Sequence, residues 1–401
     1  MATAAMTLAT SCSSDAVVEE QQAANAIQFG VTTGNASRAA SYYCNNDKPT
    51  QFNVWAATDG KTYFENESFS QKGGKGNWTI DGDFARFWPS TEVSFFAVNN
   101  GKGDASFATV NWNKTDLVPT IDMTVKTEAS IQEDLLYAYT KKTKTVADNK
   151  CVADLNFRHA LSQVVFKAQN KNKNIYVEIS EVQVANLKTK GTFTFPTEVT
   201  NNNSLNNKHD QSGVIDVNDP SFGKWSNLGT TAPFTTTGAF GPIAVPCNKK
   251  EGENLEAVGV VNLTNNEGTA KGDGSDKANE QQNKTFSLIV LPQELGHAVY
   301  NKVNNKWEED KAYFIVKCHV KNVAKGDGLA ATADDVTLYK GDIYIPVDIK
   351  WEVGKKYIYT FVFSEKGHAG YDEKGNDVLI PIEFNVTVDD FADAKNNDIN
   401  I

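Results

Sequence analysis

Arginine is scarce in this 401-residue chain, which holds only Arg38, Arg86 and Arg158 among its 39 basic residues. The 50 acidic residues outnumber the basic ones, so the formal net charge is −11. No lysine or arginine cluster stands out either, although a nucleic-acid-binding protein needs a basic face for the phosphates. We therefore expect a solvated acidic surface and no nucleic-acid partner.

Long apolar runs and catalytic motifs are also missing. No stretch of about 18 apolar residues predicts a membrane-spanning helix. The chain has no GxSxG elbow, HExxH pair, P-loop or GxGxxG after a strand, and its five histidines are scattered. Acidic loops such as "GYDEKGND" lack the ligand order of an EF-hand. We expect a protein that is not an enzyme and holds neither a cofactor nor a metal.

The few cysteines form no CxxC pair and no metal-ligand spacing. Cys318 lies in an alternating stretch and is predicted to be a buried thiol. Spacing alone leaves open whether the others pair in an oxidising compartment; we favour no disulfide. The five positions are Cys12, Cys44, Cys151, Cys247 and Cys318.

Alternation of apolar and polar residues dominates the chain from residue 27 onward. It is seen in "QFNVWAAT", "EVSFFAVN", "IYVEISEVQVANL", "AYFIVKCHV", "DIYIPVDIKW" and "KKYIYTFVF". Only "SIQEDLLYAYTKK" and "FRHALSQVV" could form a helical turn or two. Many short strands with turn-rich connections predict an all-β protein of antiparallel sandwiches. A polar break near residue 147 suggests an N-terminal domain at 27–147 and a C-terminal domain at 148–401.

The first and last expected strands stand out. The strand at 27–32 places Ile27, Phe29 and Val31 on one side, and the loop after it carries Arg38. The strand at 378–388 contains Pro381, which favours an edge or an inserted position. So long an apolar edge is an aggregation hazard that something should cover; the alternative is an ordinary edge strand packed on its own domain. Its alternating apolar residues are Val378, Ile380, Ile382, Phe384, Val386 and Val388.

A short stretch of small and apolar residues at the N-terminus ends in "LATSC". Small residues just ahead of Cys12 resemble the lipoprotein signal of bacteria, in which that cysteine becomes the lipidated first residue. The positively charged start of such a signal is absent and the apolar stretch is short. Residues 1–26 are thus interpreted as signal and tether, with an incidental cysteine in an unstructured start as the alternative.

Aromatic residues gather in the first half of the chain. They could form a carbohydrate-binding face, but their period-two placement favours core packing. The residues are Trp55, Tyr63, Phe64, Trp78, Phe87, Trp88, Phe95 and Phe96.

Several segments together resemble the fimbrillin family, the type V pilins and fimbrillin-like lipoproteins of Bacteroides-type bacteria. They are "LATSC", "SRAA", "YFENESF", "DFARFWPSTEVSFFAV", "DLLYAYT", "LNFRHALSQVVFKA", "FSLIVLPQ" and "GKKYIYTFVF". The resemblance implies two tandem transthyretin-like sandwiches in a subunit of a surface fimbrium. It also implies an outer-membrane lipoprotein precursor whose first strand is removed by an arginine-specific protease, after which a neighbouring subunit donates a strand to the emptied groove.

Carried onto this sequence, the resemblance places the cleavage between Arg38 and Ala39, and folded structure is expected to shield the other two arginines. Ile27, Phe29 and Val31 would leave, and the strand at 378–388 would be the donor. The partners implied are other fimbrial subunits, the outer membrane through a lipid on Cys12, and a host or bacterial surface ligand. A solvated Arg38 that is never cleaved is the alternative. The chain would then be a non-polymerising surface lipoprotein that binds carbohydrate or protein, or a fimbrial anchor.

Overall fold

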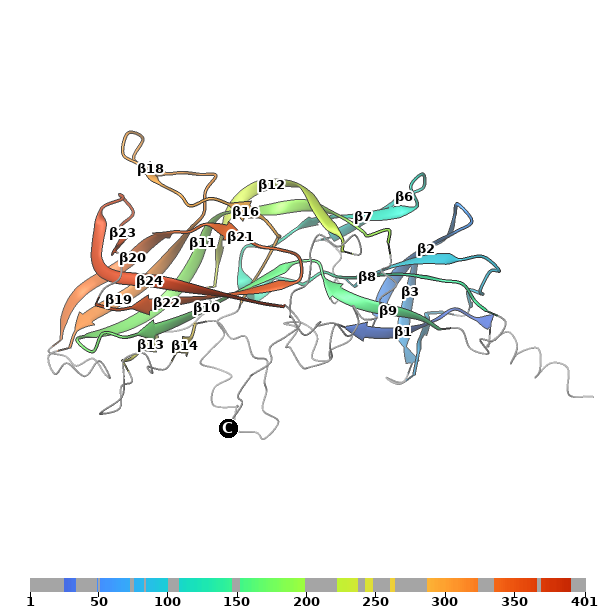
Figure 1. Cartoon of the computed structure of the whole chain (residues 1–401), viewed down its shortest axis with the longest axis horizontal. Coiled ribbons are helices and arrows are strands. Elements are labelled where there is room, and N and C mark those ends of the chain that lie inside the picture. The colour runs from blue at the N-terminus through green and yellow to red at the C-terminus, as the bar shows by residue number, and fades with distance from the viewer. Residues whose placement is uncertain are drawn as a thin grey trace, which may run out of the picture.

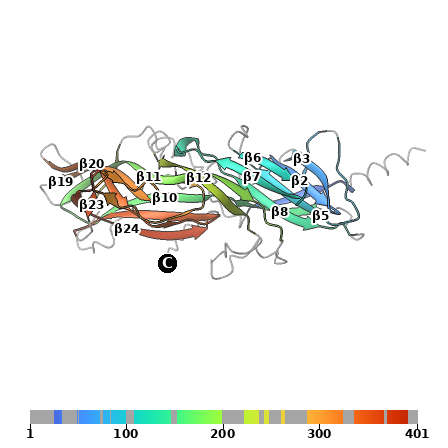
Figure 2. The same cartoon turned by 90° about the horizontal axis from the view of Figure 1, so that it is seen from above.

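The structure, a computed structural model, describes most of the chain and consists almost entirely of strands. The all-β prediction is confirmed. Figures 1 and 2 show an elongated molecule with a barrel at one end and a larger sheet at the other. Among the described residues no helix has the length and apolar character needed to cross a membrane. The described residues are 25–33, 49, 51–72, 76–82, 84–99, 108–145, 152–198, 222–236, 242–247, 260–263, 287–323, 335–365 and 369–390.

A closed barrel forms the N-terminal end, with the strand order β1-β4-β3-β2-β5-β8-β9. Its strands are antiparallel neighbours except where β1 and β9 pair in parallel and close the barrel. The strands are β1 (Gln28–Thr33), β2 (Gln51–Thr58), β3 (Lys61–Gln71), β4 (Trp78–Ile80), β5 (Val93–Asn99), β8 (Leu136–Lys142) and β9 (Val152–His159).

The larger sheet runs in the order β14-β10-β22-β24-β23-β20-β19-β11-β7-β6, with β12 and β13 on β11 and β15 on β10. Its strands are β6 (Ala108–Asn113), β7 (Val118–Thr124), β10 (Ser162–Asn170), β11 (Ile175–Thr194), β12 (Lys224–Thr235), β13 (Ile243–Val245), β14 (Val261–Asn262), β15 (Leu288–Val290), β19 (Tyr313–Asn322), β20 (Val336–Pro346), β22 (Lys355–Phe363), β23 (Ala369–Tyr371) and β24 (Asp377–Asp390). Two small pairs complete the fold, β16 (Glu294–Leu295) with β21 (Ile349–Lys350) and β17 (Tyr300–Asn301) with β18 (Lys306–Trp307).

The larger sheet folds over on itself so that β10 and β22 face β11 and β19. Phe166 of β10 contacts Phe314 of β19 with ring centroids 5.5 Å apart, and Phe361 of β22 contacts Phe314 at 5.6 Å. All three side chains are fully buried. Alternate residues of each strand therefore fill the space between two layers, as the period-two pattern predicts.

The barrel has apolar residues on both faces of β5. Phe95 points inward and contacts Phe29 of β1, with ring centroids 5.1 Å apart. Its neighbour Phe96 points outward and contacts Trp112 of β6 at 5.8 Å. Since successive side chains of a strand face opposite sides, this strand joins the barrel core to the larger core.

The two expected helical turns are mostly strand. "SIQEDLLYAYTKK" begins within a short 3-10 turn, Ala129–Ile131, and continues into β8. "FRHALSQVV" contains the end of β9, a turn, and the start of β10. In each segment some apolar residues recur three to four positions apart, which is the spacing of a helical face. Here that spacing arises because the chain turns between two strands.

The expected division near residue 147 lies between β8 and β9, two neighbours in the barrel. The β6–β7 hairpin, from the first half of the chain, pairs with the end of the 20-residue strand β11. Hydrogen bonds thus cross the division in both directions. Independent folding of 27–147 and 148–401 stays a prediction.

Candidate functional site

β1 and the residue just before it, Ile27, place three alternate apolar side chains in the barrel core. Ile27, Phe29 and Val31 are 3%, 0% and 3% exposed. The ring of Phe29 lies edge-on to two others, with centroids 4.8 Å from Phe69 and 5.1 Å from Phe95. The strand therefore fills the centre of the barrel with one aromatic anchor flanked by two aliphatic ones.

The backbone of β1 joins segments that are distant in the sequence. Along β9 it pairs over its whole length, from Gln28 opposite Val152 to Thr33 opposite Phe157. On its other side only Phe29 pairs with β4, and the Ile27 amide donates to the Arg86 carbonyl at 2.7 Å. Figure 1 shows β1 and β9 side by side at the lower edge of the barrel. Loss of β1 would open the barrel and leave the backbone of β9 unpaired on that side.

The outward face of β1 is also closely fitted. The Asn77 side-chain amide donates to Gln28 Oε1 at 3.0 Å. A Cβ atom at Gly30 would lie 2.7 Å from Asp154 Oδ1, so the carboxylate of Asp154 occupies the space beside this glycine.

Cys12, Arg38 and Ala39 lie outside the described residues. The residues before and after the predicted cleavage point are placed, because β1 ends at Thr33 and β2 begins at Gln51.

The other two arginines have partners in folded structure, and both are half-buried. Arg86 forms an ion pair with Glu67 and lies over the Phe64 ring at 5.9 Å. The guanidinium of Arg158 lies 4.3 Å from the centroid of the Phe222 ring.

β24 changes its partner part-way along its length. Asp377 and Pro381 pair with β23, whereas residues from Ile382 to Asp390 pair with β22. Within the described residues, the first half of β24 therefore lies beside β23 alone and the second half beside β22 alone. Pro381, which has no N–H to donate, lies at the switch, and this explains how a 14-residue strand accommodates a proline.

Burial along the alternating face of β24 is complete as far as Ile382 and then falls sharply. In the distal half, residues 382–388, Ile382 still lies in the core, Phe384 is only half-buried at its margin, and the residues after Phe384 extend past it. Leu379, on the opposite face, is 87% exposed. The exposed fractions along the alternating face are 6% for Val378, 7% for Ile380, 4% for Ile382, 44% for Val386 and 53% for Val388.

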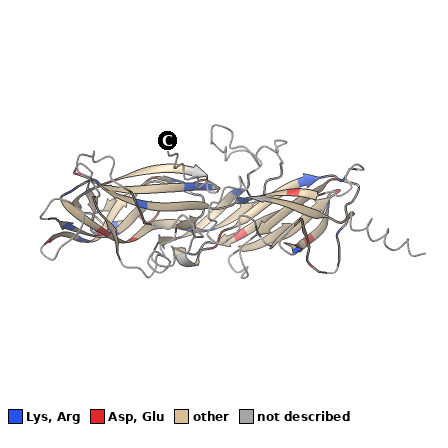
Figure 3. Cartoon of the chain, turned by 90° about the horizontal axis from the view of Figure 1, so that it is seen from below, with Lys and Arg blue, Asp and Glu red and all other residues tan. Residues whose placement is uncertain are grey.

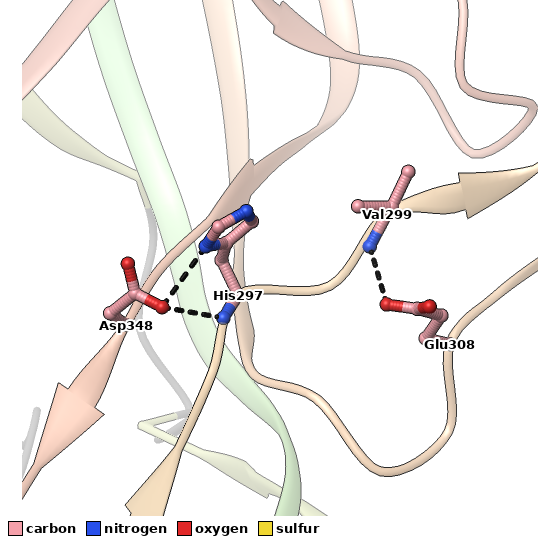
Figure 4. A network of polar contacts seen from close by, with 4 residues as sticks. All are labelled: His297, Val299, Glu308 and Asp348. Carbon is pink, nitrogen blue, oxygen red and sulfur yellow. Dashed lines mark hydrogen bonds and ion pairs between the residues drawn. The ribbon is translucent and has the colours of Figure 1, made fainter.

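The described histidines lie apart from one another. His159 contacts Asp134 near the end of β9, and His319 Nε2 lies 2.9 Å from Thr337 Oγ1. On an exposed loop Asp348 Oδ1 accepts from the His297 amide at 2.8 Å and lies 3.0 Å from His297 Nδ1 (Figure 4). These hydrogen bonds lower the pKa of Asp348. The part of the chain that the structure describes contains no group of three His, Cys, Asp or Glu arranged to hold a metal.

Cys318 is a buried thiol of β19, as its alternating stretch predicts. Burial, with a smaller contribution from Asp342, raises the pKa of this thiol to about 12. At neutral pH it is therefore protonated and a poor nucleophile. Cys247 is buried as well. Cys12, Cys44 and Cys151 lie outside the described residues.

An aromatic cluster that sequence reasoning missed lies around the β17–β18 hairpin. Trp307 stacks on Tyr344 with ring centroids 5.5 Å apart and planes 5° from parallel. Among the described residues Trp307 Nε1 has no hydrogen-bond partner. Its members come from four separate stretches of the sequence, so no local motif marks them; they are Tyr300, Trp307, Tyr313, Tyr344 and Tyr371.

Most of the aromatic residues of the first half lie in cores rather than on a face. Phe87 is 39% exposed and Tyr63 is half-buried. Trp55, Phe64, Trp78, Trp88, Phe95 and Phe96 are buried. Lysine, arginine, aspartate and glutamate are interspersed along the described strands in the view of Figure 3.

Comparison with known proteins identifies related folds. A crystal structure of a fimbrial protein from Bacteroides vulgatus superposes with a TM-score of 0.52 at 12% identity, over 91% of this chain and 99% of that one. Candidate cell adhesion proteins from Bacteroides uniformis and Parabacteroides distasonis give TM-scores of 0.41 and 0.42, both at 12% identity, over 92% of this chain and 98% and 99% of theirs. The Bacteroides vulgatus protein and this chain share a fold.

No functionally curated protein matches the sequence. The model of the family described as fimbrillin-like matches residues 37–221. The chain is thus fimbrillin-like over residues 37–221, which confirms the resemblance seen in its sequence.

Proposed function

We propose that this chain is a structural and adhesive subunit of a bacterial surface fimbrium, with no enzymatic role. Cleavage between Arg38 and Ala39 would free β1, and a strand from a neighbouring subunit would take its place. The observation that carries this proposal is the position of β1: it fills the barrel core, yet a single cut after Thr33 and before Gln51 separates it from the rest of the chain. The fimbrillin-like match begins at residue 37, beside Arg38.

The vacated groove would be unstable in water. The three anchors, Ile27, Phe29 and Val31, are almost fully buried. At about 1.5–3 kcal/mol for each side chain, their burial stabilises the barrel by on the order of 6 kcal/mol. A donated strand would restore that burial with its alternate side chains and would pair with the backbone of β9. In strand addition the backbone hydrogen bonds provide affinity, and the fit of the side chains provides specificity.

β24 is the proposed donor, with Val378, Ile380, Ile382, Phe384, Val386 and Val388 as its apolar face. Its first half is buried in its own sheet, so donation of that half would open the core of its own subunit. Removing everything after Asp377 would therefore cost three buried side chains and destabilise the fold. Point substitutions at the exposed residues Val386 and Val388 are the better test.

The remaining features concern the location of the subunit. We propose that Cys12 carries a lipid, that residues 1–26 form the signal and tether, and that an outer-membrane precursor gives rise to a cell-surface fimbrium. The barrel together with the β6–β7 hairpin would correspond to one transthyretin-like sandwich. The folded larger sheet would correspond to a second one in tandem. Other subunits of the same kind are the partners, with a host or bacterial surface molecule as ligand.

Cleavage of the full chain by an arginine-specific protease tests the assembly. We expect cleavage after Arg38, loss of residues 1–38, and growth of polymers in light scattering. Arg38→Lys should block all three, while Arg86→Lys and Arg158→Lys should change none of them, since both side chains already have partners in folded structure. A cleaved chain that stays monomeric would refute the proposal.

The aromatic cluster favours a second candidate function, a surface lipoprotein that binds carbohydrate without polymerising. Aromatic rings offer flat apolar faces for sugar rings, and the Trp307 indole N–H has no acceptor among the described residues. A glycan array with the uncleaved chain and with Trp307→Ala tests this. Binding that disappears in the variant supports it, and an array without signal for either protein argues against it.

A further inference from the structure

β1 and the distal half of β24 have closely similar sequences. Residues 27–33 read "IQFGVTT" and residues 382–388 read "IEFNVTV", both from N to C. Four of the seven positions are identical, and a fifth exchanges glutamine for glutamate. The identical residues include all three anchors that β1 places in the barrel core.

We propose that residues 382–388 of one subunit occupy the position of residues 27–33 in the next, in the same direction and register. Ile382, Phe384 and Val386 then enter the sites of Ile27, Phe29 and Val31. This inference rests on the proposed function and narrows it, because Val378 and Ile380 do not enter the groove.

The shape of the groove selects this register over its neighbours. The alternation along β24 allows shifts by two residues, but only residues 382–388 place a phenylalanine where Phe29 lies. In this register Pro381 corresponds to Ala26, which lies before the β1–β9 ladder. A shift to 380–386 would put Pro381 in place of Gln28, within the ladder, where its missing N–H would lose a hydrogen bond.

The outward-facing positions also fit. Glu383 would replace Gln28 and offers a carboxylate oxygen to the Asn77 amide, which donates to Gln28 Oε1 at 3.0 Å. Asn385 would replace Gly30, where a Cβ atom meets Asp154 Oδ1 at 2.7 Å. Because Asp154 is exposed, its carboxylate has room to move aside and accept a hydrogen bond from the Asn385 side-chain amide.

Burial favours the exchange once β1 has gone. In its own subunit the segment leaves Val386 44% exposed, whereas Val31, its counterpart in β1, is 3% exposed. Phe384 is half-buried and its counterpart Phe29 is 0% exposed, while Ile382 and Ile27 are equally buried at 4% and 3%. Until a groove opens, the segment pairs with β22, with Ile382 opposite Phe363 and Val388 opposite Tyr357. The same seven residues are thus less completely buried in their own subunit than they would be in the barrel of a cleaved neighbour.

Cysteine cross-linking measures the register directly. Asp154→Cys is combined in turn with Glu383→Cys, Asn385→Cys and Thr387→Cys in the full chain, with Cys44 and Cys151 replaced by serine, and cleavage after Arg38 starts the assembly. Because Gly30 lies opposite Asp154, we expect the Asn385→Cys pair to form intersubunit disulfides about tenfold faster than the other two pairs, whose Cα atoms would be too far apart. Each uncleaved chain, which keeps its own β1, serves as the control.

Each other outcome overturns the inference at a defined level. Faster cross-linking by Glu383→Cys or Thr387→Cys would reject the register while leaving strand exchange in place. Polymers without cross-links in any pair would reject residues 382–388 as the inserted segment. Cleaved chains that form no polymers at all would reject the proposed function as well.

A second experiment needs no assembly. The substitutions Gln28→Glu, Gly30→Asn and Thr33→Val make β1 read as residues 382–388, and we expect thermal unfolding within about 3 °C of the unchanged protein. The matched control gives β1 the sequence of residues 380–386, which places Pro and Ile at the positions of Gln28 and Phe29; we expect it to abolish cooperative unfolding of the barrel. Equal stability of the two variants would contradict the register.

Discussion

β1 and the distal half of β24 carry nearly the same side chains and bury them very differently. In β1 the phenylalanine is fully buried among aromatic rings from three other strands. In β24 the matching Phe384 is half-buried, and the valine that follows is 44% exposed. The first strand closes a barrel and has neighbours on both sides, while the second extends along a sheet with one neighbour.

This contrast separates what a strand can bury from what its surroundings allow it to bury. Identical alternation gives both segments the capacity to fill an apolar groove, and only the barrel supplies one. A segment whose apolar face is incompletely covered in its own subunit is suited to insertion into a neighbouring subunit, provided that the neighbour has lost β1.

The largest effect should come from truncating the central anchor. Phe29→Ala should lower the free energy of unfolding of the uncleaved chain by about 3–5 kcal/mol, because it leaves a cavity between the rings of Phe69 and Phe95. Phe384→Ala, its counterpart in β24, should cost about 1–2 kcal/mol, since that ring is already half-buried. Urea unfolding of the two variants measures the difference. Equal losses would show that the two sites are alike.

The valine pair should give opposite results in stability and in assembly. Val386→Ser should change the stability of the uncleaved chain by less than about 1 kcal/mol and slow polymerisation of the cleaved chain about tenfold. Val31→Ser should lower the stability by about 2 kcal/mol and leave polymerisation of the cleaved chain unchanged, because its strand has then gone. Light scattering and urea unfolding read the two properties. Slower polymerisation of the cleaved Val31→Ser chain would contradict the claim that β1 has left before assembly.

A smaller effect concerns the core on which β24 rests. Because burial raises the pKa of Cys318 to about 12, the thiolate is depleted about a thousandfold relative to an ordinary thiol at pH 8. Alkylation followed by peptide mass spectrometry should find this cysteine the slowest to react in the native chain. Since the folded state holds this proton more tightly, the stability that it contributes falls as pH rises above the ordinary thiol value. Rapid alkylation of Cys318 would show that the layer opens.

The smallest effect should lie in the turn before β24. The Asp372 carboxylate accepts hydrogen bonds from the side chain and the backbone N–H of Asn376 and from the backbone N–H of Lys374, each at 2.8 Å. These hydrogen bonds lower the pKa of Asp372. Because the group is exposed, Asp372→Ala should cost no more than about 0.5 kcal/mol at pH 7. The lowered pKa means that this contribution is present above the ordinary aspartate range and lost as pH falls through the lowered value. Thermal unfolding at pH 7 and pH 3 checks this, and a difference that grows in acid would contradict it.

Local alternation predicted most strands and the side chains that they bury. "AYFIVKCHV" became β19 with Cys318 in the core, and "DVLIPIEFNVTVDD" became β24 with Pro381 at a change of partner. Burial of Ile27, Phe29 and Val31 follows from the same pattern. These features depend on side chains one or two residues apart, which a sequence displays directly.

The arrangement of the strands could not be predicted in the same way. Pairing of β1 with β9 joins residues more than a hundred positions apart, and nothing in either segment specifies that partner. Burial along β24 ends at Phe384 because the covering layer ends there, although the alternation continues to Val388. The aromatic cluster around Trp307 likewise depends on tertiary contacts.

Native mass spectrometry of the full chain after cleavage at Arg38 tests the central claim most directly. We expect residues 1–38 to leave and residues 39–401 to appear as a series of oligomers that contain no N-terminal fragment. A persistent one-to-one complex of the two fragments, with β1 still in its barrel and no oligomers, would contradict the exchange of this strand.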